Sequence, residues 1–98
     1  MESKLEFSER ARDNLLALRK RGQQVIADSI EVHLRNEPDK PTRKRKRLEE
    51  NPLAPWELRI GDFRAFYDVD RDAAIVVILA IGQKVHNKLY IGGEEIEL

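Results

Sequence analysis

Two arginines, Arg59 and Arg64, are the residues whose types and spacing point most clearly to chemistry. They lie on segments of alternating apolar and charged residues, Trp56–Ile60 and Phe63–Val69, which the Gly61-Asp62 loop joins into a predicted β-hairpin. This register places Arg59 directly opposite Arg64, where like charges repel. Either the two guanidinium groups clamp an anion such as a phosphate, or they are surface arginines that carboxylates offset. The nearby carboxylates are Glu57, Asp62 and Asp68.

A run of basic residues, Lys40 to Arg47, holds six cations and no acid. Clustered lysines and arginines can contact the phosphates of a nucleic acid and release its counterions. A solvated, mobile loop is the alternative. No aromatic residue is interleaved, so stacking of single-stranded bases is not supported here. The candidate substrate-binding residues of the run are Arg43, Lys44, Arg45, Lys46 and Arg47.

Four polar residues farther along the chain alternate with period two: Lys84, His86, Lys88 and Tyr90. In an extended segment all four side chains project from one face. Histidine is the natural proton shuttle near neutral pH, and lysine or tyrosine can act as acid or base when the surroundings shift the pKa. An ordinary polar edge strand is the alternative interpretation.

Metal and cofactor chemistry find no support in the sequence. Cysteine is absent, and the two histidines lack the HExxH spacing of a zinc site. His33 lies at the border of an apolar helical stripe, so we interpret it as structural. The alternating Asp68, Asp70 and Asp72 lack the glycine and glutamate of an EF-hand loop, and turn formation explains them better. We therefore predict no metal and no other cofactor.

The elements that must position these side chains begin with a short predicted strand, Lys4–Phe7. Ser8 is a good N-cap for a helix from Glu9 to about Arg21, which Gly22 is expected to stop. A second amphipathic helix resumes at Gln23 and ends near Asn36. The two helices are expected to form a hairpin that covers one face of a sheet.

The sheet is expected to follow the long connection of residues 37–55, a length often associated with function. Its third main strand, Ala73–Ile81, is apolar almost throughout and follows a turn at residues 70–72. Gly82-Gln83 is expected to end this strand. Lys84–Ile91 is a possible last strand, followed by Gly92-Gly93 and an acidic tail. The predicted class is α+β, a two-helix hairpin on a twisted antiparallel sheet in the order β-α-α-β-β-β, with a possible last strand.

The length of 98 residues indicates one small domain over residues 1–98. The 18 Lys and Arg balance the 18 Asp and Glu, so a polyanion would have to bind a patch and not the whole surface. The longest apolar run is too short to span a membrane, and the segment MESKLEF has no signal-peptide core. We expect a soluble cytoplasmic protein without a membrane partner.

The chain resembles, over nearly its whole length, the RelE/ParE superfamily of toxins from type II toxin–antitoxin systems. The segments that carry the resemblance are LEFSERARDNLLAL, WELRIGDFRAFYDVD and VVILAIGQKVHNKLY. A RelE-like toxin is an mRNA interferase: an endoribonuclease that cuts mRNA on the ribosome without a metal and so inhibits translation. In that reaction the 2′-OH of the RNA attacks the adjacent phosphate. The implied partners are a small cognate antitoxin, the ribosome and mRNA. The superfamily also implies two alternatives, a ParE-like inhibitor of DNA gyrase and a non-toxic antitoxin-binding homologue.

The resemblance also implies roles for single residues. Arg64 and Lys84 match positions that stabilise the transition-state phosphate, and Arg59 matches a basic position that orients the RNA backbone. His86 or Tyr90 would act as general acid or base, and the two remain alternatives. The basic run Arg43–Arg47 falls where such toxins meet ribosomal RNA. The chain departs from the RelE pattern at Glu57, where active members often carry a lysine.

Overall fold

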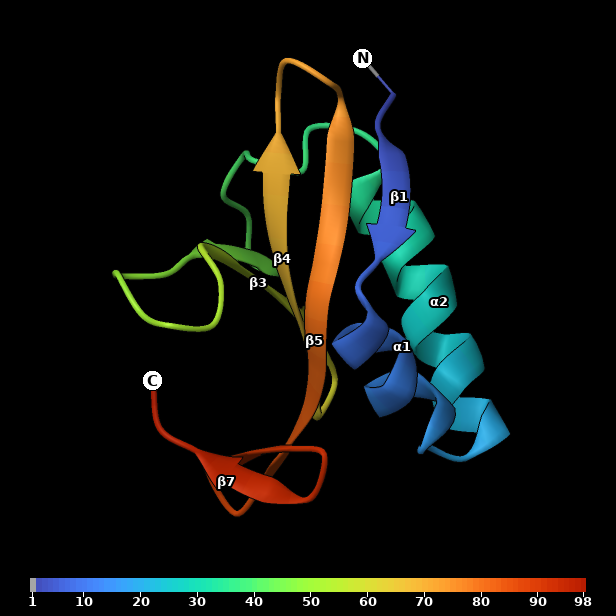
Figure 1. Ribbon diagram of the computed structural model, residues 1–98, viewed down its shortest axis with the longest axis vertical. Coiled ribbons are helices and arrows are strands. Elements are labelled where there is room, and N and C mark those ends of the chain that lie inside the picture. Colours follow the sequence, from blue (N-terminus) through green and yellow to red (C-terminus); the bar gives the residue numbers. More distant parts are fainter. Residues whose placement is uncertain (1) are drawn as a thin grey trace.

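Within residues 2–98, which the computed structural model describes, the chain forms two helices and seven strands (Figure 1). The helices lie side by side on one face of the sheet, which confirms the predicted α+β class and the order of the main elements. Two short strands, β2 and β7, were not predicted. The bounds are β1 Lys4–Phe7, α1 Glu9–Leu16, α2 Lys20–Leu34, β2 Arg45–Arg47, β3 Trp56–Ile60, β4 Phe63–Asp70, β5 Ile75–Val85, β6 Lys88–Ile91 and β7 Glu94–Ile96.

The strand β5 organises the sheet, whose order is β2-β3-β4-β5-β6-β7 with β1 also on β5. The first residues of β5 pair in parallel with β1, from Lys4 opposite Ile75 to Phe7 opposite Ile78. The last residues of β5 pair antiparallel with β6. The expected antiparallel sheet is therefore confirmed for the β2–β7 path, and β1 adds one parallel pair.

The β3–β4 hairpin has the predicted register. Trp56 faces Tyr67, and Arg59 faces Arg64. Gly61 has φ 57°, the positive value that the first loop residue of a type II′ turn requires. The rings of Trp56 and Tyr67 stack with centroids 6.0 Å apart, so the hairpin contributes a large aromatic pair to the core.

The boundary between the two helices differs from the prediction. Ser8 caps α1 as expected, because its Oγ accepts a hydrogen bond from the Ala11 amide at 3.1 Å. However, α1 ends at Leu16, and Gly22 lies inside α2, which begins at Lys20. The Gln23 side chain in the first turns of α2 donates to the carbonyl of Leu18 at 2.8 Å. This bond satisfies the carbonyl of Leu18 in the segment between the helices, as a glycine C-cap would have been expected to do for the end of α1.

The strand β5 continues through Gly82 and Gln83, where the sequence predicted its end. A Cβ atom at position 82 would lie 2.9 Å from side-chain atoms of Leu89 and Ile91 and from the Tyr90 carbonyl oxygen. Glycine is therefore present because β6 packs closely, and not because the strand breaks. At its other end β5 starts two positions later than predicted, since Ala73 and Ala74 belong to the preceding turn.

The predicted single extended segment Lys84–Ile91 is wrong. His86 and Asn87 have φ 52° and 66° and form a tight turn between β5 and β6. Two consecutive residues with positive φ are typical of a type I′ hairpin. Gly92 and Gly93 make a similar turn, with φ 60° and 82°, and the predicted acidic tail begins with β7.

Two apolar cores lie on opposite faces of the sheet. The larger core joins the helices to Leu58, Tyr67 and Ile78 and their neighbours on one face. The smaller core surrounds Phe66 and Ala80 on the other face. Apart from Leu79 of β5, its other members come from the segment between β2 and β3 and from the β6–β7 hairpin, and Figure 1 shows these segments on the side away from the helices. This second face therefore carries a partial cover that leaves room for polar side chains.

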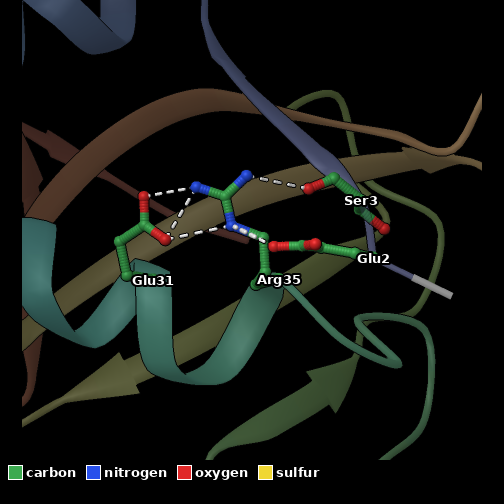
Figure 2. A network of polar contacts seen from close by, with 4 residues as sticks. All are labelled: Glu2, Ser3, Glu31 and Arg35. Atoms are coloured by element: carbon green, nitrogen blue, oxygen red, sulfur yellow. Dashed lines mark hydrogen bonds and ion pairs between the residues drawn. The ribbon is translucent and has the colours of Figure 1, made fainter.

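Arg35, directly after α2, forms hydrogen bonds that connect Ser3 to the end of that helix (Figure 2). Its Nη1 donates to the Ser3 carbonyl at 3.1 Å, and its Nε donates to Glu31 at 3.0 Å. The Ser3 amide in turn donates to the Arg35 carbonyl at 2.7 Å. These bonds hold the residue before β1 against the end of α2. No helix in residues 2–98 is long and apolar enough to cross a membrane.

Candidate functional site

Charged side chains from neighbouring strands gather on the sheet face opposite the helices. Glu57 and Arg59 alternate along β3 with three core residues that face the helices, so both project from the other face. Register places Lys46 of β2 beside Glu57, and Arg64 of β4 beside Arg59. Lys84 of β5 lies on this face as well, two positions beyond Gly82, which pairs with Arg64. We call Lys46, Glu57, Arg59, Arg64 and Lys84 the polar face.

The predicted conflict between Arg59 and Arg64 is offset mainly by Glu57. The Glu57 carboxylate lies 3.6 Å from Arg64 Nε, and the two side chains are only 13% and 11% exposed. Arg64 Nη1 also donates to the carbonyls of Gly61 at 2.7 Å and Phe63 at 2.8 Å. Arg64 is thus fixed by its own hairpin. Arg59 is exposed and forms no ion pair within the described part of the chain, so it is available to an anion.

The basic run and Arg59 together line a first hollow of about 330 Å³. The Arg59 amide donates to the Lys44 carbonyl at 2.9 Å, which continues the β2–β3 pairing toward the turn. Lys44 and Lys46 alternate on the strand and lie on the same side as Glu57. Arg43 also lines this hollow. The run is therefore a built cationic wall, and the alternative of a mobile loop does not hold for residues 45–47, which form β2.

Two arginines of the run are engaged elsewhere. Arg45 donates through Nη1 to the His33 carbonyl at 2.7 Å and through Nε to the Lys40 carbonyl at 2.9 Å. The Arg47 guanidinium lies over the Trp56 ring, 5.6 Å from its centroid. Both also border the first hollow, but these contacts give them a structural role. His33 has a lowered pKa because of its burial and the charges of Lys44 and Arg45, which fits the predicted structural role.

A second hollow, of about 420 Å³, adjoins the first, and Glu57 lines both. Lys84 lines this second hollow, and its amide donates to the Asp62 carbonyl at 2.7 Å in the β3–β4 turn. Lys88 and Glu95 line this hollow as well, with Lys88 Nζ 3.9 Å from the Glu95 carboxylate. The acidic residues after Gly93, which the sequence predicted as a tail, therefore border the polar face.

The prediction that Lys84, His86, Lys88 and Tyr90 share one face is wrong. Lys84 pairs with Leu89, whereas Tyr90 pairs with Gln83 and so faces the other side of the sheet. His86 lies at the tip of the turn and is exposed. The chain reverses at residues 86 and 87, so a count of every second residue does not carry across the turn. Lys84 is the one member of this group that register places on the polar face.

The sequence indicated Glu57 as a carboxylate that could offset the charges of Arg59 and Arg64, and the structure makes it a functional candidate. Its position between Leu58 and Trp56 in an alternating strand was the available signal, because it fixes the face on which the side chain lies. No group of three or more His, Cys, Asp or Glu side chains within residues 2–98 is arranged to hold a metal ion. The arrangement brings cations around one carboxylate, which suits a ligand with phosphate groups.

Comparison with known proteins places this fold in a family. The family model described as the ParE toxin of the type II toxin–antitoxin system parDE matches residues 5–86. The chain belongs to the ParE toxin family. It is therefore a type II toxin of the RelE/ParE superfamily, as the sequence motifs indicated. A search of curated protein sequences gave no significant match.

Two solved complexes, the first described as a toxin–antitoxin complex, contain a chain whose fold is similar to that of this toxin. The RelBE2 complex from Mycobacterium tuberculosis matches with a TM-score of 0.75 and 25% identity, over 86% of this chain and 93% of that one. The archaeal RelE–RelB complex from Pyrococcus horikoshii OT3 matches with a TM-score of 0.66 and 23% identity, over 83% and 93% of the two chains. The second match is a likeness of fold alone.

Proposed function

We propose that the toxin is an endoribonuclease that cleaves mRNA on the ribosome and that an antitoxin protein neutralises it. The single observation that carries this proposal is the first hollow, where Arg59 and the basic run form one cationic wall. An mRNA backbone presents a regular row of phosphates, and the cations of this wall can neutralise their charge without a metal. The similarity to a chain in the toxin–antitoxin complex RelBE2 supports a small antitoxin partner.

The proposed roles follow from exposure and pairing. Arg59 and Lys46 are exposed and bind the RNA phosphates, whereas Arg64 is largely buried and holds the hairpin and Glu57 in place. Lys84 faces the adjoining hollow and stabilises the charge that develops on the reacting phosphate. Arg43 and Lys44 extend the cationic wall toward ribosomal RNA. His86 and Tyr90 lie away from Lys84, so we assign them no step at the phosphate.

The test is a reconstituted translation system in which mRNA ends are mapped by primer extension. The wild-type toxin is expected to produce new ends at defined codon positions on ribosome-bound mRNA. Arg59→Ala should lower the cleavage rate about tenfold to hundredfold, the effect of one lost charged hydrogen bond. The matched control is Arg10→Ala, because Arg10 is an exposed arginine of α1, in the layer on the other side of the sheet. Equal rates for both variants would contradict the assigned site.

Inhibition of DNA gyrase is the second candidate function. The name of the matched family model favours it, and so does the separation of His86 and Tyr90 from Lys84, because a binding inhibitor needs no acid–base pair. A supercoiling assay with purified gyrase and the same preparations separates the two functions. Loss of supercoiling without codon-positioned mRNA ends would replace the first proposal with the second. The absence of both activities would favour a homologue that only binds its antitoxin.

A further inference from the structure

Transfer of the phosphate to a 2′-oxygen requires a group that removes the 2′-OH proton. Apart from Glu57, the side chains of the polar face are lysines and arginines, whose cationic groups are hydrogen-bond donors without an acceptor. His86 lines neither hollow, and Tyr90 lies on the opposite face. Of the residues that line the first hollow, Glu57 is the only carboxylate.

The position of Glu57 suits a proton acceptor. It lines both hollows, so a nucleotide bound across the polar face would pass over its carboxylate. Its side chain is 13% exposed, and Arg64 at 3.6 Å orients it from the next strand. Glu95 and Glu97 also line the second hollow, but both are exposed. Glu95 lies on the edge strand β7, is 42% exposed and is paired with Lys88, and Glu97 follows that strand.

We infer that Glu57 is the general base of mRNA cleavage in this toxin, an inference that rests on the proposed function. The 2′-OH proton moves to a Glu57 carboxylate oxygen as the 2′-oxygen forms a bond to phosphorus. The bond from phosphorus to the 5′-oxygen breaks, and that oxygen takes a proton from the Lys84 ammonium. The products are a 2′,3′-cyclic phosphate and a 5′-OH end. Exchange with water returns the proton to Lys84 and removes it from Glu57, so the cycle closes.

The charged groups around Glu57 come from every strand packed near it. Lys46 on β2, Arg59 on β3, Arg64 on β4 and Lys84 on β5 surround the carboxylate. Lys88, Glu95 and Glu97 border the second hollow.

The test uses single-turnover cleavage of ribosome-bound mRNA at pH 7 over a range of toxin concentrations up to saturation, with the wild type, Glu57→Gln and Glu57→Asp. Glu57→Gln keeps the shape and removes the base, so we expect a rate at saturation that is at least about a hundredfold lower, with an unchanged half-saturating toxin concentration. Glu57→Asp should retain part of the rate. Urea unfolding curves of all three proteins establish that they are folded.

The outcomes separate the two proposals. If the wild type cuts mRNA and Glu57→Gln cuts equally fast or faster, Glu57 is not the base and the proposed function stands. A rate that is as low in Glu57→Asp as in Glu57→Gln assigns Glu57 to structure, because aspartate keeps the carboxylate that a base needs. If the wild type makes no codon-positioned cuts, the proposed function fails and this inference fails with it. New ends that carry a 3′-phosphate and never a cyclic phosphate would also overturn the inference.

Discussion

Gly82→Ala is expected to destabilise the toxin, because position 82 has no room for a methyl group. The added Cβ would lie 2.9 Å from Leu89 Cδ1, Ile91 Cγ1 and the Tyr90 carbonyl oxygen. The two side chains can rotate, but the carbonyl belongs to the backbone of β6, so the strand itself must shift. Overpacking of this kind costs about 1–3 kcal/mol. The loss of backbone freedom in the unfolded chain returns roughly 0.4–1 kcal/mol.

The net loss is therefore roughly 0–2.6 kcal/mol, with a midpoint of about 1.3 kcal/mol, in the free energy of unfolding, measured by urea denaturation and circular dichroism at pH 7. In a domain of this size the midpoint corresponds to a drop in Tm of roughly 5–10 °C. The control is Gly22→Ala, where the nearest atom to the new Cβ is Phe63 Cζ at 3.2 Å and the helix gains about 0.5–1 kcal/mol in propensity. Its Tm should stay near or above the wild-type value. A Gly82→Ala protein as stable as the wild type would refute the close packing of β6 on β5.

Three further changes test other parts of the fold by the same unfolding measurement. Arg59→Thr should change the free energy of unfolding by only tenths of a kcal/mol, and upward if at all, because it removes the repulsion with Arg64. Ser8→Ala should cost about 1–2 kcal/mol, because Ser8 both caps α1 and donates to the Leu79 carbonyl at 3.0 Å. Tyr67→Phe should cost about 1–2 kcal/mol at pH 7, because the buried hydroxyl donates to the Pro38 carbonyl at 2.7 Å. Burial raises the pKa of Tyr67, so its contribution is complete below about pH 10 and is lost as the pH rises toward the folded pKa.

Each of these expectations has a contrary result. A loss above ~2 kcal/mol for Arg59→Thr would make Arg59 a member of a structural ion pair. An unchanged Tm for Ser8→Ala would mean that α1 does not depend on its cap. If the wild type and Tyr67→Phe lose the same stability above pH 10, a different group governs the alkaline transition.

The β3–β4 hairpin could be predicted to the residue because local rules decide it. A two-residue loop with glycine first fixes the turn, the turn fixes the register, and alternation then assigns each side chain to a face. The opposition of Arg59 and Arg64 followed from that register alone.

The end of β5 could not be predicted in this way. A glycine within a strand is compatible with a break or with close packing, and only the position of β6 decides between them. The His86-Asn87 turn could not be predicted either, because it lacks the Asn-Gly pair that marks such turns in a sequence. The missed turn placed Tyr90 on the wrong face, and it accounts for most of the difference between the predicted and observed site.

The role of Glu57 depended on pairings between strands distant in sequence. Sequence could show that its charge was close to Arg64, and the structure shows the contact at 3.6 Å. Its place between two hollows required β2 and the β6–β7 hairpin, neither of which the sequence predicted. Functional sites at strand junctions combine contributions from several segments, so their geometry follows only when every register is known.

The parallel pair of β1 and β5 has a consequence for the order of folding during synthesis. The Ser8 hydroxyl bonds to a carbonyl 71 residues later in the chain, and the whole of β1 pairs with residues 75–78. Closing such a long loop has a high entropic cost, and contacts of this range slow folding. A nascent chain can complete neither its sheet nor the docking of β1 until Ile78 has left the ribosome. The toxin therefore stays incomplete through most of its own translation, and it reaches its complete fold only after nearly the whole chain has been made.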